Sequence, residues 1–109
     1  MTNFRELLKQ VKEQVGETSA EEVFARLEGP GKPSLLDVRE DDEVANGIVP
    51  SARHLSRAHF ESRVEDVLPD KDAEIVVYCQ SGVRSAFAAR TLQDLGYSNV
   101  SSMRGGFTR

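Results

Sequence analysis

The chain contains one cysteine, Cys79, in the segment Tyr78-Cys79-Gln80-Ser81-Gly82-Val83-Arg84-Ser85-Ala86. A strand pattern precedes this residue and a helix pattern begins near Arg84 or Ser85, so a short loop with a glycine at its centre joins the two. The backbone N–H groups of such a loop, together with the free amides of the first helical turn, can converge on one negatively charged atom. The helix dipole favours the same charge and therefore favours a thiolate over a thiol. We predict that Cys79 is a reactive nucleophile and that residues 80–85 form its anion-binding loop.

Two residues of the loop have properties that suit this chemistry. Arg84 supplies a permanent positive charge and a two-pronged hydrogen-bond donor for an oxyanion. Gly82 can adopt a backbone conformation with φ > 0 that other residues resist. The alternative is that Cys79 is an inert buried side chain, because free cysteines are among the most buried residues. The spacing alone does not choose sulfur transfer over other thiolate reactions.

Composition and charge restrict the classes of protein to consider. A chain of 109 residues with a formal net charge of -4 fits one domain that does not bind nucleic acid. No apolar run approaches the length of about 18 residues that spans a bilayer, and the N-terminus lacks the apolar stretch of a secretory signal. We therefore expect a cytoplasmic protein without a membrane partner. Cys79, His54 and His59 lack the close spacing of a metal motif, so no metal site is predicted.

Strand and helix patterns alternate along the chain. Residues 34–38 and 74–78 are short apolar runs typical of strands, residues 53–55 form a weaker strand pattern, and residues 98–102 are a last strand candidate. Helices are expected over residues 4–15, from Ser19 with Val23, Phe24 and Leu27 on one face, over 40–46, over 58–67 and over 85–95. This alternation predicts an α/β fold with a mostly parallel central sheet flanked by helices on both faces. Ligands of such sheets bind beyond the carboxyl ends of the strands, where Cys79 is expected.

Three ordered motifs resemble those of the rhodanese-like domains. The loop Cys79-Gln80-Ser81-Gly82-Val83-Arg84-Ser85 is similar to the family's active-site loop, Cys-x-x-Gly-x-Arg-[Ser/Thr]. The upstream resemblance comprises Leu36-Asp37-Val38-Arg39-Glu40, Glu43, Gly47 and Ile48-Val49-Pro50-Ser51-Ala52, and the downstream one comprises Arg90, Leu92, Leu95-Gly96-Tyr97 and Gly105-Gly106-Phe107. The resemblance covers about residues 20–107 and implies a single rhodanese domain.

The resemblance implies a thiosulfate sulfurtransferase that needs no metal or organic cofactor. Cys79 would take the outer sulfur of thiosulfate or of a persulfide donor and hold it as a persulfide. Cyanide, a thiol or a protein acceptor would then remove it. Arg84 and Arg57 are the expected substrate-binding residues, with Arg84 either orienting the anionic donor or tying down the loop. Asp37 and Arg39, at the end of the first strand, are expected to be structural, either supporting the loop or forming an ion pair.

The chain departs from the family pattern in two places. The upstream motif of the family usually reads Gly-His-Ile-Pro-Gly-Ala, whereas Gly47 is followed here by Ile48-Val49-Pro50-Ser51-Ala52. The sequence ends at Arg109, where the family usually continues through a tryptophan and a final helix. We expect an N-terminal helix within residues 1–18 and a rhodanese domain over residues 19–109 that lacks its C-terminal helix or is cut from a longer protein.

Two other functions compete with sulfur transfer. Related phosphatases and arsenate reductases place five residues between the cysteine and the arginine of the loop, whereas four separate Cys79 from Arg84. The shorter loop favours sulfur over a tetrahedral phosphate. The second alternative is a non-catalytic interaction or regulatory module. Inactive rhodanese-like domains usually lack the cysteine, so the presence of Cys79 favours an enzyme.

Overall fold

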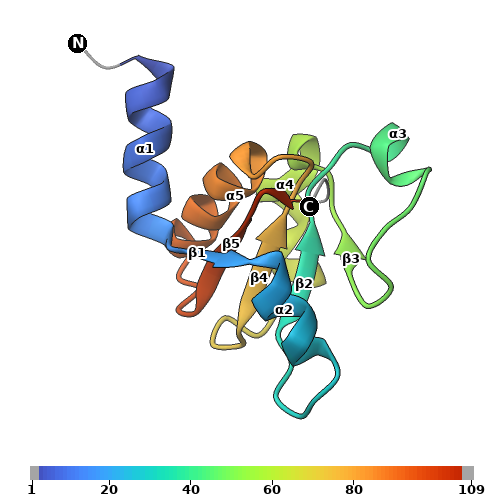
Figure 1. The fold of residues 1–109 in the computed structure, drawn as a ribbon. Helices are drawn as coiled ribbons and strands as arrows, with labels where there is room; N and C mark the ends of the chain where they lie inside the picture. The colour runs from blue at the N-terminus through green and yellow to red at the C-terminus, as the bar shows by residue number, and fades with distance from the viewer. Residues whose placement is uncertain (1–2, 107–109) are drawn as a thin grey trace.

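A computed structural model describes residues 3–106, and Figure 1 shows its helices and strands. Phe107 and Arg109, which the sequence analysis named, lie outside the described residues. The elements are α1 (Phe4–Val15), β1 (Glu17–Ser19), α2 (Ala20–Leu27), β2 (Ser34–Asp37), α3 (Asp41–Val44), β3 (Arg53–His54), the 3-10 helix η1 (Arg57–His59), α4 (Phe60–Val67), β4 (Ile75–Tyr78), α5 (Val83–Asp94) and β5 (Val100–Arg104).

The five described strands form one sheet in the order β1-β5-β4-β2-β3, and every neighbouring pair is parallel. Strand β4 lies in the middle, paired with β2 on one side and β5 on the other. All four of its residues are buried, as its unbroken apolar sequence predicted. The carboxyl ends of the strands therefore lie at one edge of the sheet, and β4 delivers Cys79 to that edge.

Side-chain alternation along the strands divides the core into two layers. Ile75, Val77 and Cys79 point to one face, where they pack with residues of α1, α4 and α5. Val76 and Tyr78 point to the other face, where they pack with residues of α2. The predicted α/β fold with a parallel sheet and helices on both faces is confirmed.

Helix boundaries follow the expected capping chemistry. The Asn3 side chain accepts a hydrogen bond from the backbone of Glu6 and begins α1. Gly16 ends this helix with a φ of 74°. Ser19 caps α2 through the Glu22 amide, as its spacing predicted. The caps fix α1 and α2 on either side of β1.

Three sequence predictions need correction. Strand β1 was missed, because Glu17-Thr18-Ser19 is a polar edge strand without an apolar pattern. Phe24 was expected on the apolar face of its helix, but its side chain is 43% exposed. The helix expected over 58–67 is divided at Phe60 into η1 and α4. Within residues 3–106, no helix has the length and apolar character needed to cross a membrane.

Candidate active site

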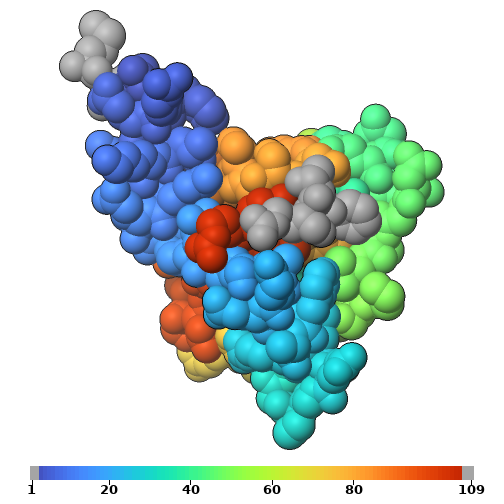
Figure 2. All heavy atoms as spheres, viewed as in Figure 1, coloured from blue at the N-terminus to red at the C-terminus, as the bar shows by residue number. Residues whose placement is uncertain are grey.

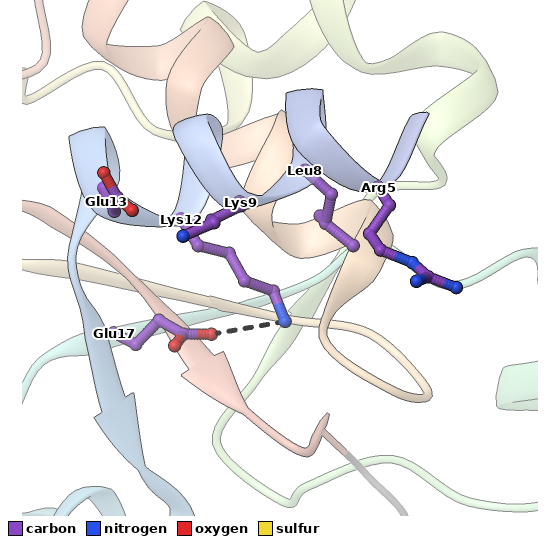
Figure 3. A pocket seen from close by; sticks show the side chains of 6 residues that line it. All are labelled: Arg5, Leu8, Lys9, Lys12, Glu13 and Glu17. Atoms are coloured by element: carbon purple, nitrogen blue, oxygen red, sulfur yellow. Dashed lines mark ion pairs between the residues drawn. The ribbon is translucent and has the colours of Figure 1, made fainter. Parts of the chain in front are cut away.

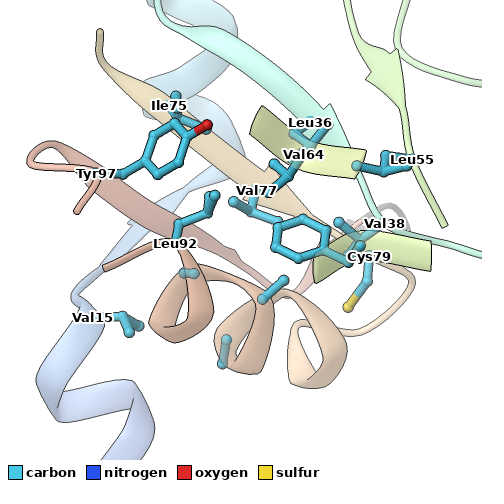
Figure 4. Close-up of a cluster of buried hydrophobic side chains, with 14 of the residues drawn as sticks. Val15, Leu36, Val38, Leu55, Val64, Ile75, Val77, Cys79, Leu92 and Tyr97 are labelled. Carbon is cyan, nitrogen blue, oxygen red and sulfur yellow. The ribbon is translucent and has the colours of Figure 1, made fainter. Parts of the chain in front are cut away.

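Cys79 lies directly after β4, on the face of the sheet that α5 covers. Because it follows Ile75 and Val77 by two-residue steps, its side chain points to the same face as theirs. Figure 4 shows its sulfur directed toward α5. The residue is 1% exposed, so the surrounding protein encloses its side chain.

The sulfur of Cys79 is surrounded by hydrogen-bond donors from the start of α5. The backbone N–H of Gly82 lies 3.1 Å from Sγ, and the backbone N–H of Ser85 lies 3.4 Å from it. The Ser85 hydroxyl is 3.6 Å from the sulfur and 2.8 Å from the hydroxyl of Ser102 on β5. A hydroxyl has one proton to donate, so Ser85 donates to an ionised sulfur when Ser102 donates to Ser85.

These donors change the acidity of the thiol. Burial raises the pKa of Cys79, because a buried charge is costly. Hydrogen bonds from the hydroxyl and amide of Ser85, and from the amides of Ser81 and Gly82, lower the pKa by more than burial raises it. The pKa of Cys79 therefore lies below its ordinary value, and the thiolate is favoured as a nucleophile.

Two glycines allow the loop to adopt its compact form. Gly82 has a φ of 96°, the left-handed conformation that the sequence predicted for this residue. Gly106, just beyond β5, packs against the backbone of Cys79 and Gln80. A Cβ atom on Gly106 would lie 2.3 Å from the carbonyl oxygen of Cys79 and 2.8 Å from the carbonyl group of Gln80. The end of β5 therefore supports the loop from behind and leaves no room for a side chain.

Arg84 forms a two-pronged ion pair with Glu43 of α3. Its Nη1 and Nη2 atoms lie 2.5 and 2.8 Å from the two carboxylate oxygens. Glu43 also accepts a hydrogen bond from the Glu40 amide in the capping box of α3. Arg84 first and this amide second hold the pKa of Glu43 at about 2. The pair ties the loop to α3 and engages the guanidinium that was expected to bind substrate.

Asp37 and Arg39 form a buried ion pair at the end of β2. The guanidinium donates Nε to both carboxylate oxygens at 3.1 and 3.0 Å and Nη2 to one of them at 2.8 Å. Nη2 also donates to the Gly47 carbonyl at 2.7 Å. Both side chains are at most 2% exposed. This geometry fixes the segment after β2, from which α3 and Glu43 extend.

The side chain of Arg57 contacts α4 and α5, whereas its backbone N–H donates to the Val38 carbonyl at 3.1 Å. Its Nη1 donates to Glu61 at 2.8 Å, its Nη2 lies 3.5 Å from the hydroxyl of Thr91, and its guanidinium lies over the ring of Phe60. Thr91 lies six residues after Ser85 on α5. These contacts hold the guanidinium of Arg57 against α4 and α5, and its role in substrate binding stays a prediction.

The sequence analysis did not assign Ser102 to the site, and it gave Glu43 no role beyond its place in a motif. Ser102 is a fully buried polar residue in a strand, and its position opposite Ser85 depends on the pairing of β5 with β4. Glu43 and Arg84 are 41 residues apart in sequence. In both cases the contact joins residues that lie far apart in the sequence, so the sequence pattern alone does not reveal it. The Nε2 of His54 donates a hydrogen bond to the Arg39 carbonyl at 2.7 Å. Within residues 3–106 no cluster of His, Cys, Asp or Glu could hold a metal ion.

The sequence is similar to a known family model and to two sulfurtransferases. Residues 19–109 match the family model described as Rhodanese-like domain. The chain is 35% identical over 92 residues to a sulfurtransferase of Allochromatium vinosum, which covers 84% of each chain. It is 34% identical over 93 residues to the putative sulfurtransferase YtwF of Bacillus subtilis, covering 85% of this chain and 87% of the relative.

Solved structures share the fold. The human single-domain sulfurtransferase TSTD1 matches 84% of this chain and 91% of its own, with a TM-score of 0.75 and 26% sequence identity. The matched family region begins at Ser19. It includes the loop around Cys79, whereas α1 lies before it.

Proposed function

Because the chain belongs to the rhodanese-like domain family, as its motifs predicted, we propose that it is a sulfurtransferase in which Cys79 carries sulfur as a persulfide. The observation that carries this proposal is the position of Sγ, which accepts hydrogen bonds from the amides of Gly82 and Ser85. These donors stabilise a thiolate before the reaction. They are also close enough to stabilise the terminal sulfur of a persulfide.

The first half-reaction loads the cysteine. The Cys79 thiolate attacks the outer sulfur of thiosulfate, a new S–S bond forms, and the bond to the sulfonate sulfur breaks. Sulfite leaves with the electron pair, and the persulfide retains the negative charge that the thiolate had. The pKa of Cys79 is lowered by its hydrogen bonds, so this step needs no separate general base.

The second half-reaction returns the cysteine to its starting state. A nucleophile such as cyanide or a thiolate attacks the terminal sulfur of the persulfide. The S–S bond breaks toward Cys79, whose thiolate is again stabilised by the loop. With cyanide the product is thiocyanate, and the negative charges balance on both sides.

Arg84 acts in this scheme as a positioning residue. Its guanidinium is bound to Glu43, so we propose that it holds the start of α5 in place while backbone amides provide the electrostatic stabilisation. The same contact counts against the phosphatase alternative, in which the arginine must face the oxyanion. We propose that Asp37 and Arg39 support the loop indirectly, by fixing the segment that leads to α3.

Steady-state kinetics test the proposal. With thiosulfate and cyanide varied together, thiocyanate formation should give parallel double-reciprocal lines, because the sulfur is carried on the enzyme between two separate steps. Cys79→Ser should abolish turnover while leaving the circular dichroism spectrum unchanged. Intersecting lines, or turnover that survives in folded Cys79→Ser, would refute a covalent route through Cys79.

A further inference from the structure

A groove of about 340 Å³ lies beside α1, and its lining carries both signs of charge. The lining consists of one half-buried leucine and five charged side chains: Arg5, Leu8, Lys9, Lys12, Glu13 and Glu17. Arg5 lies in the first turn of α1, whereas Glu13 lies in its last turn and Glu17 begins β1. Figure 3 shows Arg5 at one end of the groove and Glu13 and Glu17 at the other. The groove therefore has a positive end and a negative end.

The charges in the groove are only partly neutralised within the chain. Arg5, Lys9 and Glu13 are exposed, and within residues 3–106 none of the three forms an ion pair. Lys12 lies 3.8 Å from Oε2 of Glu17, yet that buried oxygen accepts no hydrogen bond from the described residues. The Glu17 side chain is 20% exposed, so its carboxylate can still take a donor from outside. Both ends of the groove thus have charge left for a partner.

Helix α1 is fixed to the domain by one flank and leaves its charged flank exposed. Val11 and Val15 are buried in the core that α1 shares with α5. The ring of Phe4 stacks on that of Phe87 of α5, with centroids 6.1 Å apart. The space-filling view shows α1 as a ridge along one side of the molecule (Figure 2). A partner can therefore bind the charged flank without having to order the helix first.

The order of the charges along the groove decides which kind of partner fits. An anion bound at Arg5 and Lys9 would leave the two carboxylates at the other end unmatched. A polycation bound at Glu13 and Glu17 would be repelled by the two cations. The complementary partner carries the same charges in the reverse order along its length. A second copy of α1, running antiparallel to the first, presents its charges in that order.

We propose that the charged flank of α1 binds a second copy of the chain across a two-fold axis, with the two α1 helices antiparallel. With the axis at the level of Val11, Lys9 of each copy lies opposite Glu13 of the other, and Arg5 lies opposite Glu17. The spacing fits, because Arg5 precedes Lys9 by four residues and Glu13 precedes Glu17 by four. The two-fold symmetry forms each ion pair twice. The guanidinium of Arg5 supplies the hydrogen-bond donor that the Glu17 carboxylate lacks.

The contact is small, so the dimer should be weak. Helix α1 has 12 residues, which is about 18 Å of helix, and a contact of this length is at the low end of specific interfaces. We expect a dissociation constant of roughly 10 to 500 μM at low ionic strength. Helix α1 lies before the matched family region, so this surface belongs to the N-terminal segment of the chain and does not depend on sulfur transfer.

Sedimentation equilibrium of the full chain measures the dimer. The protein is examined at low ionic strength and at concentrations up to about 1 mM. All variants carry Cys79→Ser, which removes the one cysteine, so no disulfide can join two copies. We expect a monomer–dimer equilibrium that shifts toward the monomer as salt is added, because exposed charges are screened. A chain that stays monomeric at every concentration would overturn the proposal.

Two single charge reversals locate the contact on α1. Lys9→Glu places a carboxylate opposite Glu13 of the second copy, and Glu13→Lys places an ammonium group opposite Lys9. Each change replaces two attractive contacts in the dimer by two repulsive ones, so each variant alone should dimerise at least about tenfold more weakly. Both side chains are exposed, so the fold should tolerate either change. Lys32→Glu is the matched control, because Lys32 is an exposed cation in the loop between α2 and β2, and this variant should dimerise like the unreversed chain.

Mixing the two reversed variants tests whether Lys9 and Glu13 face each other. In a heterodimer of Lys9→Glu with Glu13→Lys, opposite charges meet again at both contacts. An equimolar mixture should therefore dimerise about as tightly as the unreversed chain, although neither variant does so alone. If either variant alone dimerises as tightly as the unreversed chain, the dimer uses another surface. If both are weakened and the mixture is not restored, the two side chains do not face each other. Either result would overturn the proposal.

Discussion

Replacing Glu43 with glutamine tests the ion pair that holds the candidate loop. Glu43 makes two kinds of contact, a two-pronged pair with Arg84 and a capping hydrogen bond from the Glu40 amide. Glutamine has nearly the same size and can still accept the capping bond. The substitution Glu43→Gln therefore removes the charge and keeps most of the shape.

The size of the effect follows from the acidity of Glu43. Its pKa is lowered from 4.5 to about 2, chiefly by hydrogen bonds from Arg84, which corresponds to about 3.4 kcal/mol of stabilisation if it were fully realised. The side chains of Arg84 and Glu43 are 34% and 27% exposed, so solvent screens part of this energy, and the capping bond remains in the variant. We expect Glu43→Gln to lower the free energy of unfolding by about 1–2 kcal/mol at pH 7.

The loss of unfolding free energy in Glu43→Gln should decrease as the pH falls. A carboxylate whose pKa is lower in the folded state stabilises the protein above its unfolded pKa, and this stability is lost as the pH falls through the folded pKa. The difference between wild type and Glu43→Gln should therefore be full at pH 7, decrease below about pH 4.5 and vanish near pH 2. Urea unfolding followed by circular dichroism at pH 7, 4.5 and 3 measures it.

A matched control separates this pair from an ordinary surface pair. Glu61 of α4 pairs with Arg57 of η1, and the Glu61 side chain is 59% exposed, so Glu61→Gln should cost less than about 0.5 kcal/mol. The reasoning is refuted if Glu43→Gln costs no more than Glu61→Gln. It is also refuted if the cost is the same at pH 3 as at pH 7.

Three further changes test other parts of the site. Ser85→Ala should raise the pKa of Cys79 and move the pH profile of iodoacetamide alkylation upward, and an unchanged profile would contradict the role of its hydroxyl. Gly106→Ala should slow persulfide formation roughly 10- to 100-fold, whereas Gly31→Ala, at a similar positive φ with nothing within 4 Å, should not; equal rates would exclude a packing role. Asp37→Asn should cost about 3–5 kcal/mol in urea unfolding because it removes the carboxylate that neutralises the buried guanidinium of Arg39, and a loss under about 1 kcal/mol would contradict that pairing.

The sequence predicted those parts of the fold whose apolar pattern is strong. Strand β4 is apolar throughout and buried on both faces, and α1 has the 3.6-residue period of a helix with one buried face. Strand β1 could not be found in this way. Its three residues are polar, and they form a strand because β5 offers an unpaired edge.

The local conformation of the loop could be predicted, but its long-range contacts could not. The cysteine, the left-handed Gly82 and the helix start within the loop follow from neighbouring residues. Glu43 of α3 pairs with Arg84, and the hydroxyl of Ser102 on β5 contacts that of Ser85. One sequence does not show which distant side chains meet. The sequence therefore identified a guanidinium suited to an anion, while the fold pairs it with Glu43.

Intact mass spectrometry under single-turnover conditions tests most directly whether Cys79 carries the sulfur. Wild type incubated with thiosulfate should gain one sulfur atom, lose it when cyanide is added, and release one equivalent of thiocyanate. Folded Cys79→Ser should show no gain. A wild-type protein that keeps its mass with both thiosulfate and polysulfide, or a sulfur that remains on Cys79→Ser, would contradict the persulfide mechanism.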